Sequence, residues 1–204
     1  MKRLSREFYA RSTLTVAREL IGKRLVRHVD AGRRTPLAGR IVETEAYLGA
    51  DDRASHAARR TSVRARIMYG TPGHAYIYQI YGMYYCLNAV TEVDGTAGAV
   101  LVRALEPVSG VEQMAVNRGR PMPVERLARG PGCLCQALAL DTALNGLDLC
   151  GDALWIEDDG EGDPVVDEGP RVGVDYAQED ALKPWRFWEA GNRCVSRPRR
   201  KTSS

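Results

Sequence analysis

Residues 75–88 read Ala-Tyr-Ile-Tyr-Gln-Ile-Tyr-Gly-Met-Tyr-Tyr-Cys-Leu-Asn and hold five of the nine tyrosines of the chain. Aromatic and β-branched residues on both sides of Gly82 are typical of strands, and the glycine interrupts the run. We therefore predict a β-hairpin over residues 74–91 whose tip is Tyr81-Gly82-Met83. Tyrosine and methionine are unusual at a turn. One use of Tyr81 and Met83 there is to push between stacked DNA bases, and the alternative is ordinary packing within a sheet.

The length of 204 residues suits one domain that buries a core. No apolar run is long enough for a membrane helix, and the first residues lack the apolar segment of a signal peptide. We expect an intracellular protein without membrane contact, cytoplasmic and associated with the nucleoid if the source is bacterial. Five cysteines without the spacing of a zinc site indicate reduced, mostly buried thiols and predict neither a metal nor another cofactor.

Charge is unevenly distributed along the chain, although the net formal charge is only +3. Residues 53–91 hold five arginines and no carboxylate, whereas residues 141–180 hold thirteen acidic residues and one arginine. A second basic block follows over residues 183–201. This distribution indicates one face toward a polyanion. The arginines beside the hairpin are candidates for phosphate contacts or, alternatively, a solvated face: Arg59, Arg60, Arg64 and Arg66.

Patterns along the rest of the chain predict further elements. We expect helices over residues 12–21, 110–117, 123–129 and 133–140, and strands over residues 23–28, 37–47, 99–105, 153–157, 165–166, 171–175 and 185–188. Ser12 or Thr13 is the expected cap of the first helix. Residues 30–36 are read as a turn, and Glu106-Pro107 as the end of the strand that begins at residue 99.

Two charged features fall inside predicted strands. Strict alternation places Glu43, Glu45 and Tyr47 on one face of the strand over residues 37–47, together with Leu37 and Ile41. A buried carboxylate without a partner is costly, so at least one glutamate is expected in a site, the alternative being a solvated or salt-bridged face. Arg103 lies between apolar neighbours, so we likewise expect it to have an anionic partner.

Several separate motifs together resemble the alkyladenine (3-methyladenine) DNA glycosylases, a family that excises damaged purines. The most specific are Arg40-Ile-Val-Glu-Thr-Glu-Ala-Tyr-Leu-Gly49 and residues 78–88, 101–107, 134–138 and 171–173, and the similarity extends over residues 8–196. With the element pattern, the resemblance implies one mixed α+β domain over residues 1–196, with a curved, mostly antiparallel sheet, a protruding hairpin and surrounding helices. Residues 197–204 are expected to form a basic, disordered tail.

The resemblance also implies roles for single residues. Glu45 would be the general base that activates water, and Arg103 would help to place that water. Tyr81 would fill the gap in the duplex, and the extruded base would lie among four side chains: Tyr47, His56, Tyr78 and Asn88. A lone histidine is more often structural than functional, which is the alternative for His56. Cys133 stands where the family commonly has a lysine. If that lysine contacts a phosphate in relatives, we expect a lower DNA affinity here or another arginine in its place.

The expected activity is hydrolysis of the N-glycosidic bond of an alkylated purine that is flipped out of duplex DNA, leaving an abasic site. The main candidate substrates are 3-methyladenine and 7-methylguanine. Hypoxanthine and ethenoadenine are secondary candidates. An alkylated purine is positively charged, so it attracts aromatic rings and leaves easily. We expect a monomer that acts on double-stranded DNA without lyase activity, since no lysine lies in a motif. The alternatives are a noncatalytic reader of damaged DNA and, less favoured, a nucleosidase.

Overall fold

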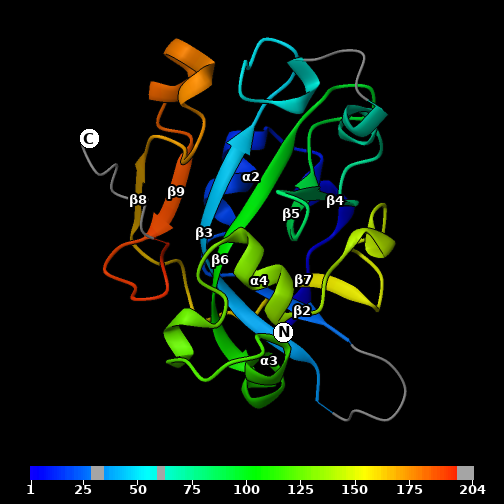
Figure 1. Ribbon diagram of the computed structural model, residues 1–204. Helices are drawn as coiled ribbons and strands as arrows, with labels where there is room; N and C mark the ends of the chain where they lie inside the picture. Colours follow the sequence, from blue (N-terminus) through cyan, green and yellow to red (C-terminus); the bar gives the residue numbers. More distant parts are fainter. Residues whose placement is uncertain (29–34, 59–62, 197–204) are drawn as a thin grey trace, which may run out of the picture.

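Nine strands form one curved sheet in this computed structural model, which describes residues 1–28, 35–58 and 63–196 (Figure 1). The strands are β1 (Lys2–Arg3), β2 (Arg24–Arg27), β3 (Leu37–Tyr47), β4 (Ala75–Ile80), β5 (Tyr84–Val90), β6 (Ala99–Ser109), β7 (Leu154–Asp158), β8 (Val166–Gly169) and β9 (Arg186–Glu189). Neighbours pair antiparallel in the order β1-β7-β2-β3-β6-β5-β4, and β8 pairs with β9, which pairs with β3. The predicted α+β fold with a mostly antiparallel sheet is confirmed.

The helices of the described residues are short. They are α1 (Arg6–Tyr9), α2 (Thr13–Glu19), α3 (Val111–Asn117) and α4 (Pro131–Ala137), with 3₁₀ segments η1 (His56–Ala58), η2 (Val63–Tyr69), η3 (Val124–Arg126), η4 (Thr142–Leu144) and η5 (Asp175–Leu182). None of these helices is long and apolar enough to cross a membrane. The main core joins apolar side chains of α2, α3 and α4 to the sheet, and Leu20, Leu87 and Leu134 in it are almost fully buried. Removal of this apolar surface from water is the chief stabilising term.

The two faces of the sheet differ in chemistry. Val100 and Val102 of β6 belong to the main core, whereas the next residue, Arg103, is directed to the opposite face toward Glu45. On β4, Ile77 likewise belongs to the main core, and Tyr76 and Tyr78 pack in a separate, smaller cluster. The alternation of a strand thus divides the chain into a packing face and a face rich in polar and aromatic groups.

The pairing of β3 with β6 contains a bulge near Glu43. Pairing with β6 passes from Ile41–Leu105 to Glu43–Ala104 and then to Thr44–Val102, so the register shifts twice. Beside this irregularity Ile41 lies in the main core, and Glu43 accepts a hydrogen bond from Arg103. The bulge also divides one edge of β3 between β2 and β9, and bulges of this kind are frequent beside active sites.

Other boundaries differ from the predictions for physical reasons. Strand β6 continues past Glu106-Pro107 to Ser109, because Pro107 lies beside a register shift where the missing N–H is tolerated. Residues 171–175 form no strand, since Gly173 adopts a positive φ of 77°. The predicted helix over residues 123–129 is reduced to η3, because the backbone of Arg129 pairs with Ala104 of β6. Most of the predicted turn over residues 30–36 lies outside the described residues.

The start of α2 is held by a residue distant in sequence. Ser12 makes no side-chain hydrogen bond as a cap. Instead, the Glu92 carboxylate accepts hydrogen bonds from the backbone N–H of Thr13 at 2.6 Å and from the hydroxyl of Thr13 at 2.7 Å. Thr13 and Thr91 place their hydroxyl oxygens 2.9 Å apart. The predicted local cap is thus replaced by a contact that joins α2 to the end of β5.

Gly98→Ala is expected to lower the free energy of unfolding by about 1–3 kcal/mol, the usual cost of overpacking. A Cβ at this position would clash with the Thr13 hydroxyl and would lie 2.9 Å from the Thr91 hydroxyl oxygen, in the contact that holds α2. Urea unfolding measures the change. Gly49→Ala is the matched control, because its Cβ would meet only the carbonyl oxygen of Ala97 at 3.5 Å. Equal stability of the two variants would contradict the prediction.

Candidate active site

Glu45 is fully buried in β3, and three groups hold its carboxylate. Oε2 accepts a hydrogen bond of 2.8 Å from the Tyr47 hydroxyl and lies 3.2 Å from Nη1 of Arg103. Oε1 accepts a hydrogen bond of 2.6 Å from the backbone N–H of Val172. Burial of a charge is tolerated only with such partners. The structure thus brings together Glu45, Tyr47 and Arg103, as the sequence predicted, and adds Val172.

Glu43 is also fully buried, and its carboxylate binds groups from β6, from β9 and from the chain after β9. Its Oε1 accepts hydrogen bonds from Nε of Arg103 at 3.0 Å, Nε of Arg186 at 2.7 Å and the Ser196 hydroxyl at 2.8 Å. Its Oε2 accepts one from the backbone N–H of Ser196 at 2.8 Å. Burial by itself would lower the pKa of Arg103, but Glu45 and Glu43 outweigh it and raise that pKa above its usual range. Two carboxylates and two guanidinium groups therefore form a buried network of balanced charge.

Sequence reasoning missed two members of this network. Arg186 lies between aromatic and apolar neighbours in a predicted strand, which is the signal that identified Arg103. It could therefore have been found. Ser196 carries no such signal, because its role depends on the position of the chain after β9.

An aromatic wall lies beside the carboxylates. It consists of Tyr47 of β3, His56 of η1, and Tyr76 and Tyr78 of β4. Nδ1 of His56 lies 2.7 Å from the Tyr76 hydroxyl, and the ring centroids of His56 and Tyr78 are 4.7 Å apart. The Asn88 side chain donates a hydrogen bond of 3.0 Å to the carbonyl of Tyr76, its partner across the hairpin. Burial, followed by the Glu45 carboxylate, raises the pKa of Tyr47 well above its usual value. Tyr47 is thus a neutral phenol that donates to Glu45.

The guanidinium group of Arg171 packs against the ring of Tyr47. Its guanidinium carbon lies 4.8 Å from the Tyr47 ring centroid and 4.9 Å from that of Trp185. It donates two hydrogen bonds, of 2.6 and 2.8 Å, to the carboxylate of Asp52 and one of 2.9 Å to the carbonyl of Ala46. Because Val172 follows directly in the chain, this buried pair also fixes the N–H that binds Glu45.

The tip of the β4–β5 hairpin projects from the sheet. Tyr81 is 87% exposed and Met83 is 66% exposed, while Tyr76 is buried. The tyrosine cluster therefore divides into inner rings that pack on the sheet and a tip that solvent surrounds. The amide of Gln79 donates a hydrogen bond of 2.8 Å to the carbonyl of Gly82 and closes the turn. Insertion of Tyr81 and Met83 into DNA stays a prediction.

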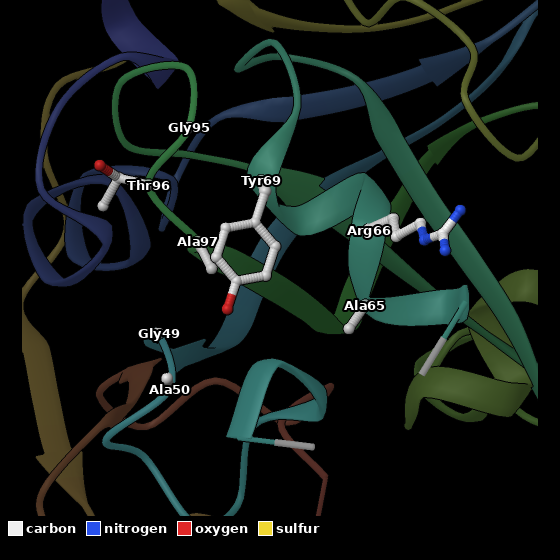
Figure 2. Close-up of a pocket in the computed structure, with 8 residues that line it drawn as sticks. All are labelled: Gly49, Ala50, Ala65, Arg66, Tyr69, Gly95, Thr96 and Ala97. Carbon is white, nitrogen blue, oxygen red and sulfur yellow. The ribbon is translucent and has the colours of Figure 1, made fainter. Parts of the chain in front are cut away.

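The predicted phosphate-binding arginines are only partly described. Arg59 and Arg60 lie outside the described residues, and of Arg64 only the backbone position in η2 is defined. Arg66 is exposed, and its guanidinium points away from the ring of Tyr69 (Figure 2). Both residues line a hollow of about 650 Å³ with Gly49, Ala50, Ala65, Gly95, Thr96 and Ala97. None of the residues predicted to contact the base lines this hollow, so it is a separate surface feature.

Comparison with known proteins places the chain among DNA repair enzymes. The model of the family described as methylpurine-DNA glycosylase matches residues 7–193. A protein of Methanocella arvoryzae named "Putative 3-methyladenine DNA glycosylase" is 52% identical over 194 residues, covering 95% of this chain and 96% of that protein. Proteins of the same name from Alkaliphilus oremlandii and Desulfitobacterium hafniense are 46% and 45% identical, each covering 96% of this chain and 99% of the relative.

Arg171→Met is expected to lower the free energy of unfolding by about 3–5 kcal/mol, because it leaves the buried Asp52 carboxylate without its partner. Urea unfolding monitored by tryptophan fluorescence measures this change. In the double variant Asp52→Asn/Arg171→Met no unpaired charge remains, so its loss should be smaller than the sum of the two single losses. Strictly additive losses would show that the pair contributes no coupling.

Proposed function

Because the chain belongs to the methylpurine-DNA glycosylase family, we propose that it hydrolyses the N-glycosidic bond of alkylated purines in duplex DNA. The products are the free base and an abasic site. The observation that carries this proposal is the buried Glu45 carboxylate beside the wall of Tyr47, His56 and Tyr78, on the sheet that also bears the exposed hairpin tip. The resemblance of the motifs to the purine-excising glycosylases supports the same reaction.

The base reaches this wall only after leaving the helix. Extrusion of a nucleotide costs a few kcal/mol and is cheapest for a damaged base. In the proposed complex Tyr81 occupies the vacated space, with Met83 beside it, as apolar wedges do in bent DNA. A side chain that is 87% exposed is available for this without unfolding any part of the sheet.

Recognition of the extruded base follows from its charge. A methyl group at N3 of adenine or N7 of guanine gives the base a positive charge, and aromatic faces attract cations by about 1 kcal/mol for a good contact. Tyr47 and Tyr78 offer such faces, and burial raises the pKa of both phenols above the usual value, so they stay neutral. Asn88 and His56 supply the polar groups that distinguish one purine from another.

Glu45 performs the hydrolysis. Val172 occupies one lone pair of Oε1, so this oxygen can accept a second hydrogen bond from a water molecule. As the bond between C1′ and the purine nitrogen breaks, the base takes the electron pair and loses its positive charge. The water oxygen bonds to C1′, and its proton passes to Glu45. Among the described residues no lysine bonds to Glu45, whose partners are Tyr47, Arg103 and Val172, so we propose hydrolysis without a lyase step.

Glu45→Gln is expected to bind methylated duplex DNA as the unchanged protein does, and to release bases about 10²–10⁴-fold more slowly, the usual contribution of a general base. Single-turnover incubation followed by chromatography of the free purines measures release, and fluorescence anisotropy measures binding. Glu19→Gln, on α2 on the opposite side of β3, is the isosteric control. Normal release by Glu45→Gln would rule out the mechanism. Binding without release by the unchanged protein would favour a noncatalytic reader of damage.

Tyr81→Ala is expected to reduce base release from a fully paired duplex about 10- to 100-fold, because nothing then offsets the cost of unstacking. On single-stranded methylated DNA, which has no stack to open, the loss should be much smaller. Tyr176→Ala removes another exposed tyrosine, which is 62% accessible, and serves as the control. Equal losses on the two substrates would contradict a wedge at position 81.

A further inference from the structure

Three arginines surround a hollow that the catalytic network does not use. Arg126, Arg129 and Arg193, with Pro123 and Glu125, line a volume of about 280 Å³, which we call the basic hollow. Three cations and one carboxylate give its lining a net formal charge of +2. Within the described part of the chain none of the three guanidinium groups forms an ion pair, although Glu125 shares the lining. Like charges gathered in this way favour an anion among them.

The basic hollow adjoins the catalytic network. The backbone of Arg129 pairs with Ala104, which follows Arg103 directly in β6. Nε of Arg129 donates a hydrogen bond of 2.8 Å to the carbonyl of Val195. The next residue is Ser196, whose hydroxyl and N–H bind Glu43. One contact therefore lies next to Arg103, which binds Glu45, and the other lies next to Ser196, which binds Glu43.

The basic hollow is also connected to the base of the hairpin, through α4. Three residues after Arg129, at the start of α4, Gly132 packs so closely on Tyr84 that an added Cβ would lie 3.0 Å from the ring. Strand β5 begins at Tyr84, directly after the exposed tip. In Figure 1, α4 lies in front of the sheet, and it packs against both β6, which carries Arg103, and the hairpin strand β5. A DNA strand held at the tip and at Glu45 therefore passes near these arginines.

We propose that the basic hollow binds a phosphodiester group of the DNA backbone next to the flipped nucleotide. This inference rests on the proposed function and adds a contact outside the arginines predicted from the sequence. A guanidinium fork matches two phosphate oxygens, and three forks around one hollow suit a single phosphate group. Such a contact fixes the position of the duplex and reads no bases. The same guanidinium groups would bind free phosphate, but the position beside the catalytic network favours a phosphate of DNA.

The test is the salt dependence of DNA binding by Arg126→Gln/Arg193→Gln. Both arginines are exposed, so the variant keeps its fold, and Arg129 is retained because it supports Val195. The slope of log affinity against log salt should fall by about one for each phosphate that the variant no longer neutralises. Single-turnover base release at saturating protein should stay within about twofold, since the hollow positions DNA and lies outside the chemistry. Anisotropy with a short undamaged duplex measures the slope.

Arg3→Gln/Arg18→Gln is the matched control. It removes the same charge from two exposed arginines, on the edge strand β1 and on α2, which packs against the opposite side of β3. Equal slopes for the two double variants would overturn the proposal. It would also be overturned if inorganic phosphate, added to the unchanged protein at constant ionic strength, lowered the slope as much as the double variant does. If the double variant melts at a lower temperature, the single variants Arg126→Gln and Arg193→Gln repeat the test with half the change.

The outcomes separate this inference from the proposed function. If the unchanged protein releases no base but the slope falls only in Arg126→Gln/Arg193→Gln, the hollow binds DNA and the glycosylase assignment fails. If base release proceeds and the slope is the same in every variant, the hollow has no role in binding and the assignment stands.

Discussion

The burial of two carboxylates on one face of β3 is the constraint on which the site depends. Glu43 and Glu45 are both fully buried, and a buried charge persists only with partners of opposite charge. Arg103 reaches both from β6, and Arg186 reaches Glu43 from β9. Since planar guanidinium groups bind in a fixed direction, the network ties β6, β9 and the end of the described chain at Ser196 to one strand.

The sheet separates stability from chemistry. One face packs on α2, where Val100 and Val102 lie in the main core, and the other face carries Glu43, Glu45, Arg103 and the aromatic wall. The bulge near Glu43 lies between the part of β3 that pairs with β2 and the part that pairs with β9. Rigid strands thus hold the candidate general base, whereas the candidate wedge at Tyr81 projects freely from a turn.

Sequence reasoning succeeded where the signal was local or carried by motifs. The hairpin, the bounds of β3 and the grouping of Glu45 with Tyr47 and Arg103 follow from alternation, from one glycine and from the resemblance to a family. It failed where a distant part of the chain intervened. Strict alternation could not show the bulge, and the cap of α2 comes from Glu92, 79 residues away from Thr13.

The sequence by itself determined which chemical groups the site contains: a carboxylate, an arginine, a set of tyrosines and a turn unsuited to an ordinary loop. Strand period and glycine conformation are properties of neighbouring residues, so they can be read from the order of amino acids. Only the tertiary structure decided how the charges are balanced. The partners of Glu43 lie 60 to 153 residues away along the chain, and a contact of that range exists only once the sheet has closed around it.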